Sequence, residues 1–438
     1  MQRRPYIKKE IMKRLVIVLF TALAAAPTYS QQKTISLSES KKAALAYSKA
    51  IKNGALGIES AQADVLAAKS AYYPSVQVVG VGAQGFKDFI SPIPPLLTQG
   101  IDNFYFTGAQ AMEPVYAGGK VRTSNELAAL QLEASRVRAQ QSTDSVLLLT
   151  EQKYWNLINL QEQYKVIIAN EHLLDTVLKQ QNDLLASGLI ARNDQLKVKV
   201  QRSKLLLNKS KLENGRKLAL LDFCFYTGMP YDSLLIMEDT LNASQLMLPD
   251  PAGPDLTLSA NTNYSLMKMQ VSGEKLQTKL TKGDYMPTVS VGVNAAVAGS
   301  VGNGIGSKFM PLALGTVSVP ISDWWGKGKQ KLKQRALSEQ AVVNRFEDVE
   351  NQLKVGITKS WYDVSDATKQ IAFAIENLAQ ATENLKVSQD NYASGLSSIT
   401  ELMDAQALYQ EASSELVTAL AGYRNKAAAY QFMIGKAQ

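Results

Sequence analysis

The sequence contains very little cysteine and histidine. Among its 438 residues there are one cysteine, Cys224, and one histidine, His172. A single cysteine excludes an internal disulfide, and the two residues together are too few for a Cys/His metal site. We expect Cys224 to be a buried apolar residue on a helix and His172 to be exposed on another. We expect no metal and no cofactor.

Proline is absent from two long parts of the chain. The 14 prolines all lie outside residues 115–229 and 321–438. Proline breaks a helix, so its absence is typical of long uninterrupted helices. Both stretches contain Ala-Ser-Gly-Leu, at 186–189 and at 393–396, and glycine suits the position just after a helix end. We therefore predict two helical hairpins, in which an arm of about 65 residues would be roughly 100 Å long.

Each predicted tip is followed by signals for a new helix. Asn193 and Asp194 are the expected N-cap and first-turn acid after the first tip, and Ser398 and Glu401 form a capping box after the second. Apolar residues between 402 and 433 recur with the 3-4-3-4 spacing of a coiled coil. Arms of this kind predict coiled coils rather than helices on a globular core.

The sequence around the two tips repeats as well. Tyr154-Trp155 precedes the first tip as Trp361-Tyr362 precedes the second, and Pro74 and Pro287 each end a helical pattern before β-like residues. The period of about 200 residues is far longer than that of a solenoid repeat, which indicates a duplicated unit. Each unit is predicted to be helix–strand–strand–long helix–tip–long helix. The fold is thus expected to be mainly α with a smaller β part.

Four segments have the pattern of β-strands, at about 76–90, 103–115, 288–298 and 311–320. Valine and alanine alternate with small polar residues along the third segment, which suits a half-buried strand of a soluble protein or an outer-membrane strand. Four strands cannot close a transmembrane barrel, whose smallest form has about eight, and open edges are not tolerated in lipid. If the strands enter a membrane, several chains must therefore form one barrel. Trp324 and Trp325 follow the last segment and suit either an interfacial aromatic girdle or ordinary packing.

The net charge of +8 is concentrated near the N-terminus. Residues 1–30 hold six basic residues and one acidic residue, so little excess remains for the rest, and we expect no nucleic-acid partner. This leading segment has the basic start, the apolar run at 15–26 and the small residues of a secretory signal peptide cleaved before Gln31, with Met12 as a second candidate start. We expect an exported protein without a transmembrane helix.

In its duplication, paired strands and tip glycines the chain resembles the TolC-type outer-membrane efflux proteins of Gram-negative bacteria. The resemblance implies a homotrimer, in which three chains build a 12-stranded β-barrel in outer-membrane lipid and an α-helical coiled-coil tunnel in the periplasm. It also implies a periplasmic adaptor and an inner-membrane pump as partners. The corresponding domains would be a signal peptide (1–30), a first repeat (31–230, tip 186–194), a linker (231–262) and a second repeat (263–438, tip 393–401).

The resemblance also places a periplasmic gate near the tips. Its residues would be Asn193, Asp194, Tyr392, Ser397, Glu401 and Asp404. Ser397 stands where the family example has an arginine, so the charged bond of that arginine to Asp194 is missing here. Glu401 has two interpretations, a helix cap with Ser398 or, with Asp404, part of a carboxylate ring that attracts cations. The expected adaptor-docking residues are Gly188, Leu189, Gly395 and Leu396.

Two other classes of function remain open. A periplasmic coiled-coil adaptor or scaffold without a channel would explain the hairpins, but not the two strand pairs at matching points of the duplication. An enzyme would need a cluster of acid, base or nucleophile in a pocket, and the sequence has no motif of that kind, so we do not expect an enzyme.

Overall fold

The computed structural model describes residues 34–95, 100–242, 253–301 and 306–436. The chain forms two compact units, each assembled from segments far apart in the sequence. The first unit consists of Met1–Ala43, Lys153–Asn242 and Ala381–Val417, and the second of Ala44–Gln152, Ala243–Gln380 and Thr418–Gln438. Within the described residues no helix combines the length and apolar character needed to cross a membrane.

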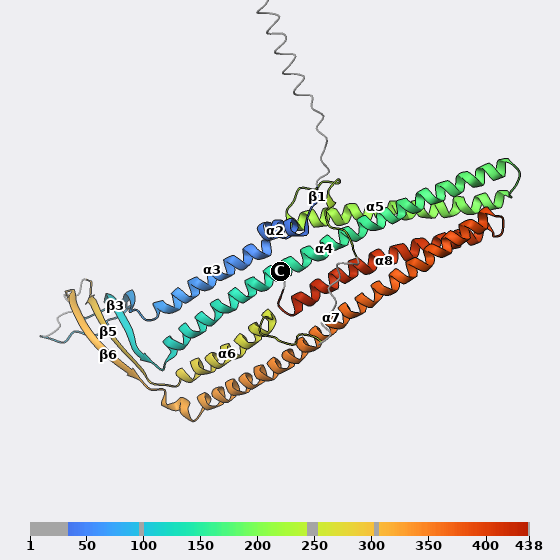
Figure 1. Cartoon of the computed structure of the whole chain (residues 1–438). Coiled ribbons are helices and arrows are strands. Elements are labelled where there is room, and N and C mark those ends of the chain that lie inside the picture. Colours follow the sequence, from blue (N-terminus) through green and yellow to red (C-terminus); the bar gives the residue numbers. More distant parts are fainter. Residues whose placement is uncertain (1–33, 96–99, 243–252, 302–305, 437–438) are drawn as a thin grey trace, which may run out of the picture. The chain divides into compact units, whose positions relative to one another are not determined.

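The predicted duplication is confirmed (Figure 1). α4 begins at residue 120 and α7 at 327, and α5 begins at 192 and α8 at 399, so both helices recur at the same interval of 207 residues. α4 and α7 each have 67 residues. The elements of the first repeat are α3 (Lys49–Ser70), β2 (Ser75–Gln84), β3 (Asn103–Ala117), α4 (Lys120–Ala186) and α5 (Arg192–Thr227). Those of the second are α6 (Thr262–Gly283), β5 (Thr288–Gly299), β6 (Lys308–Ser318), η2 (Ile321–Trp324), α7 (Lys327–Ala393) and α8 (Ile399–Met433).

The second unit contains one antiparallel sheet in the order β2-β3-β5-β6. The two repeats therefore meet in its middle, where β3 pairs with β5, and a bulge lies at Pro114 to Tyr116. β2 ends at Gln84 and not near residue 90 as predicted, because Gly85 bonds Asp102 while the adjacent Ile101 bridges to Ile90, so that residues 86–89 leave the ladder. Among the described residues, the outer edges of β2 and β6 have no strand beside them.

The N-terminal part of the described chain forms two helices and a short strand. The helical pattern before Pro74 is divided into two helices, α2 (Leu37–Tyr47) and α3, because Ser48 starts a new helix by capping the N–H of Ile51. In the first unit, β1 (Thr34–Ile35) pairs in parallel with β4 (Ile236–Met237) over the buried side chains of Tyr154 and Phe223. Cys224 is buried in this cluster and His172 is exposed, as predicted.

Tyr154 links β1 and the segment after β4 to α4. Its hydroxyl donates to the carboxylate of Asp239, with the carbonyl of Ile35 also within 3.2 Å, and it accepts from the N–H of Asp239. Burial, and then the bond to Asp239, raise the pKa of this phenol above its ordinary range. The cluster is therefore anchored by a neutral, fully bonded hydroxyl.

The tip half of the first unit is a coiled-coil core. Residues from α4, α5, α7 and α8 pack together there: Ile167, Leu174, Val177, Val198, Leu205, Leu385, Ile399, Leu402, Met403 and Ala405. Leu402 and Ala405 belong to the predicted seam, and both are almost fully buried. The first hairpin is also tied internally, since Arg202 and Lys209 on α5 pair with Asp175 and Glu171 on α4 at 2.5 and 2.6 Å.

Candidate functional site

One face of the sheet is apolar across all four strands. Residues directly opposite each other in a sheet point to the same side, so the register defines this face. We call it the valine face; its apolar members include Val76, Val78, Ala109, Ala111, Val289, Val291, Val293, Val297, Phe309, Ala313 and Val317. Tyr105 and Thr107 of β3 lie on this side as well. Val78 and Val317 are 79% and 70% exposed in the single chain. Glu113, opposite Val291, is the acid on this face.

The opposite face is mixed in character. Polar residues occur along it on every strand: Ser75, Gln77, Gln110, Ser290, Asn294, Thr316 and Lys308. Apolar residues such as Val81, Phe106 and Met310 lie between them. Strands of outer-membrane barrels alternate in this way, with an apolar side toward lipid and a polar side toward the lumen.

Aromatic residues gather where the strands join the helices. Tyr72, Tyr73, Tyr116, Trp324 and Trp325 are all exposed there. The Nε1–H of Trp324 donates to the carbonyl of Tyr285 at 2.9 Å, which fixes η2 to the turn before β5. Aromatic side chains at the end of an apolar band are typical of a membrane interface. Of the two interpretations of these tryptophans, the exposed side chains favour the girdle.

The two hairpin tips have the same geometry. Gly188 and Gly395 have φ values of 72° and 74°, which glycine adopts without penalty. In both tips the glycine N–H and the next N–H bond carbonyls of the last helical turn, at 3.0 and 2.9 Å in the first and 3.0 and 2.8 Å in the second. Leu189 and Leu396 follow these glycines and are 72% and 78% exposed. The duplicated chain therefore presents two exposed leucines in equivalent positions.

Tyr392 has a partner that the sequence did not reveal. Its hydroxyl accepts a hydrogen bond of 2.5 Å from the amide of Gln181, so the bond joins α7 to α4. Gln181 is fully buried, and its carbonyl oxygen has no partner within the described residues. The expected gate tyrosine thus connects the two hairpins through a buried amide.

Asp194 pairs with a lysine on its own helix. Lys197 Nζ lies 3.4 Å from the Asp194 carboxylate and donates to the hydroxyl of Thr400 on α8 at 3.0 Å. Lys197 therefore joins α5 to α8 close to Ser397, whose own hydroxyl is buried without a partner in the described chain. Lys197 and Thr400 were not among the predicted gate residues. The only sequence signal was a cation three residues after Asp194.

The expectation that Asn193 caps α5 is wrong. The helix begins at Arg192, so the N-cap is Ala191, which makes no side-chain bond, and Asn193 is exposed within the first turn. Asp194 lies in that first turn as expected. Ala191 corresponds to Ser398 at the interval of 207 residues, so the cap is present in the second repeat alone.

Glu401 and Asp404 are both exposed at the start of α8. The capping box is formed, since Ser398 Oγ donates to the Glu401 carboxylate at 3.3 Å and accepts from the Glu401 N–H at 3.3 Å. Asp404 has no hydrogen bond or ion pair to any described residue. At the interval of 207 residues, Glu401 corresponds to Asp194 and Asp404 to Lys197. The first tip therefore carries a neutralised pair, and the second carries two acids.

This fold is that of outer-membrane channels. The structure is similar to the outer-membrane channel OprN (TM-score 0.79, 16% identity, 91% of this chain and 89% of that chain). It is also similar to the Campylobacter jejuni CmeC outer membrane channel (0.78, 13%, 92% and 86%) and to the outer membrane protein VceC from Vibrio cholerae (0.76, 12%, 91% and 96%). No curated protein sequence matches the chain.

The second half of the sequence also matches a known family. Residues 250–436, which include the second repeat, match the family described as outer membrane efflux protein. The match and the similar structures confirm the resemblance stated from the sequence. The family and the similar structures are outer-membrane proteins, which agrees with the location expected for this chain.

Proposed function

We propose that the protein is the outer-membrane exit duct of a tripartite efflux or type I secretion system. Three copies form one 12-stranded barrel that continues into a helical tunnel in the periplasm. A periplasmic adaptor and an inner-membrane pump dock on the tips at Leu189 and Leu396 and open the gate. The gate is built from Tyr392 with Gln181, from Lys197 with Asp194 and Thr400, and from Glu401 and Asp404.

The observation that carries this proposal is the sheet. Its valine face needs an apolar environment, and the outer edges of β2 and β6 carry backbone groups without strand partners in the described chain. In lipid, each unbonded backbone group costs several kcal/mol, so open edges must be closed. Four strands are too few to close on themselves. Pairing β2 of one copy with β6 of the next removes every edge.

A disulfide experiment tests this pairing directly. Within one chain β2 and β6 are separated by β3 and β5, so their backbones lie about 14 Å apart, too far for a disulfide. In a background with Cys224→Ser, cysteine is placed at Val78 on β2 and in turn at Phe309, Ala313 or Val317 on β6. We expect covalent trimers from at least one pair in isolated outer membranes. The matched control places cysteines at Val78 on β2 and Val293 on β5. These two strands are not neighbours within one chain or across the proposed edge, so no covalent trimer is expected.

Conductance in planar bilayers separates the channel from the scaffold. We expect a small, cation-preferring conductance from the purified trimer. A folded oligomer that gives neither edge-linked trimers nor conductance would favour the coiled-coil adaptor or scaffold instead.

A further inference from the structure

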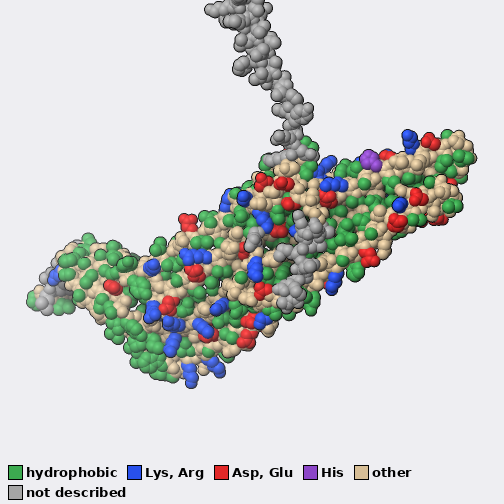
Figure 2. All heavy atoms as spheres, in the orientation of Figure 1, with side chains coloured by type: hydrophobic (Ala, Val, Ile, Leu, Met, Phe, Trp, Pro, Cys, Tyr) green, Lys and Arg blue, Asp and Glu red, His purple; other side chains and the backbone are tan. Residues whose placement is uncertain are grey.

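The second repeat begins its long helix with five cations in nine residues. They are Lys327, Lys329, Lys331, Lys333 and Arg335 at the start of α7. Cations near a helix N-terminus interact unfavourably with the helix dipole, so helix stability does not explain them. Figure 2 shows basic side chains gathered over this part of the second unit, beside the apolar sheet.

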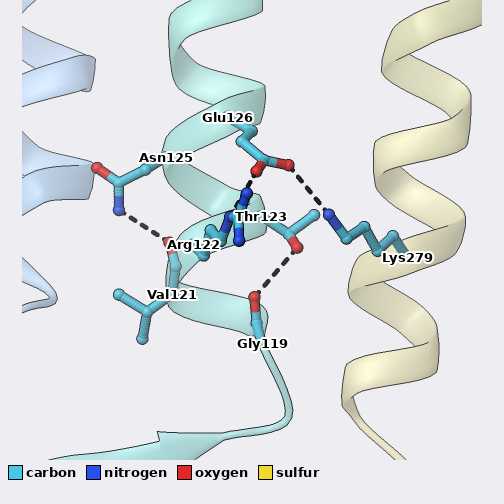
Figure 3. A network of polar contacts seen from close by, with 7 residues as sticks. All are labelled: Gly119, Val121, Arg122, Thr123, Asn125, Glu126 and Lys279. Atoms are coloured by element: carbon cyan, nitrogen blue, oxygen red, sulfur yellow. Dashed lines mark hydrogen bonds and ion pairs between the residues drawn. The ribbon is translucent and has the colours of Figure 1, made fainter.

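The first repeat provides an internal comparison. At the start of α4, Arg122 pairs with Glu126 at 2.9 Å, and Lys279 reaches the same carboxylate at 3.2 Å (Figure 3). Lys120 pairs with Asp284 at 3.1 Å. The hydrogen bonds from Lys279 and then Arg122 lower the pKa of Glu126. In the second repeat a lysine, Lys333, occupies the position of Glu126 at the interval of 207 residues. The basic side chains at the start of α4 are thus neutralised by acids, and those at the start of α7 are not.

Three lysines at the start of α7, and Lys282 at the end of α6, have no partner in the part of the chain that the structure describes. Lys282, Lys327, Lys329 and Lys333 make no hydrogen bond or ion pair through their side chains there, whereas Arg335 pairs with Glu274 at 2.9 Å. Lysines at a helix surface often pair with acids three or four residues away, but no acid lies at such a spacing before Glu339 on this helix. The charge is therefore available to a ligand.

A hollow of about 380 Å³ lies among these residues. Its lining combines two lysines, two aromatic rings and apolar side chains, with Asp323 as its acid: Lys282, Tyr285, Met286, Asp323, Trp324, Gly328, Lys329 and Leu332. Gly328 keeps its walls close, since a Cβ there would come within 2.2 Å of the Asp323 carbonyl and 2.9 Å of the Tyr285 ring. Basic groups over an aromatic and apolar floor suit a ligand with an anionic head and an apolar body.

The position of the hollow, next to the ends of the strands, indicates which ligand it binds. Lys282 lies just before β5, and Lys329 lies within one helical turn of the start of α7, which follows β6 through η2. Headgroup layers add about 5–8 Å on each side of a hydrocarbon core of roughly 30 Å, so cations placed here reach phosphate level when the sheet spans that core. Long lysine side chains extend this reach.

We propose that this hollow and the α7 lysines bind the headgroup of an anionic phospholipid in the leaflet that faces the helical part of the protein. The inference rests on the proposed function, because it requires the sheet to lie in a membrane. Lys282 and Lys329 hold the phosphate, Trp324 and Tyr285 lie beside the glycerol region, and the acyl chains run along the valine face. Lys327 and Lys333 add attraction to neighbouring headgroups.

Native mass spectrometry of the full-length trimer tests the proposal. The protein is equilibrated with mixed micelles of phosphatidylglycerol and phosphatidylethanolamine, and the bound lipids are counted. We expect enrichment of phosphatidylglycerol that falls about tenfold or more in Lys282→Gln/Lys329→Gln/Lys333→Gln, since each lysine near an anionic surface contributes a factor of about five. The matched control is Lys199→Gln/Lys204→Gln/Lys211→Gln on α5, which removes the same charge from exposed lysines without partners in the described chain.

Each outcome decides the question. Equal binding of the two lipids by the wild type, or equal losses in both variants, would overturn the proposal. Displacement of the lipid by inorganic phosphate would show a site for free anions instead. A trimer that conducts ions but has no lipid preference would refute this site and leave the channel intact, whereas lipid preference without conductance would refute the channel.

Discussion

The amide of Gln181 donates a 2.5 Å hydrogen bond to the hydroxyl of Tyr392, and this bond connects α4 of one hairpin with α7 of the other. Gln181 is fully buried there, so the bond lies where water does not compete for it. Such bonds contribute modestly when made, but leaving one partner unpaired is costly.

The first prediction concerns this bond. Tyr392→Phe leaves the Gln181 amide buried and unbonded, which we expect to cost roughly 1–3 kcal/mol and to loosen the hairpin ends. Backbone hydrogen exchange near residues 176–200 should become faster, and channel conductance should rise. The matched double variant Gln181→Leu/Tyr392→Phe replaces both polar groups and should recover most of the stability. Exchange that is unchanged in the single variant would contradict this account.

The second prediction separates the two roles of Glu401. Glutamine keeps a capping box, so Glu401→Gln/Asp404→Asn removes the charge of the second tip and preserves the cap. If these acids form a ring in the trimer, cation preference in planar bilayers should fall strongly while helicity stays the same. Ser398→Ala is the complementary variant: it removes the cap, keeps the acids and should leave the cation preference unchanged. If ion selectivity is unaltered in Glu401→Gln/Asp404→Asn, the two acids have only a structural role in the first turn of α8.

The third prediction tests the two faces of the sheet with neighbouring residues. Val78 lies on the valine face near the middle of β2, and Gln77 lies on the mixed face. Arginine on a lipid-facing position near the bilayer centre costs about 2–4 kcal/mol, so Val78→Arg should sharply lower the yield of heat-modifiable trimers. Gln77→Arg, one residue away, should assemble normally. The assignment of the faces would be reversed if Gln77→Arg failed and Val78→Arg assembled.

The fourth prediction concerns pH. The pKa of Asp255 is lowered, first by the hydrogen bond from the N–H of Thr257 and then by the Thr257 side chain and Lys436, whose ammonium lies 3.2 Å away. A lowered folded-state pKa stabilises the fold above the unfolded pKa of about 3.9, and this contribution is lost as the pH falls through the folded value. The difference in denaturation free energy between wild type and Asp255→Asn should therefore be present at neutral pH and vanish in acid. A difference that grows in acid would have the wrong sign.

Features that depend on neighbouring residues in the chain could be predicted from the sequence. The tip glycines, the capping box of Ser398 and Glu401, and the alternation along β5 all follow from local patterns. The Gln181–Tyr392 and Lys197–Thr400 bonds join different hairpins, and their partners depend on how the helices face one another. The end of β2 was misplaced because Ile101 bridges to Ile90 and residues 86–89 leave the ladder, which the alternation of β2 does not encode.

The interval of 207 residues has a consequence for symmetry. The two copies differ in charge at the starts of their helices, since Lys333 stands at the position of Glu126 and Asp404 at that of Lys197. A ring built from unduplicated chains would repeat every charge at every hairpin. In the proposed trimer, acidic and neutralised tips alternate, so the six hairpins have threefold and not sixfold electrostatic symmetry. Duplication thus lets one hairpin of each chain carry paired charges while the other presents unpaired ones.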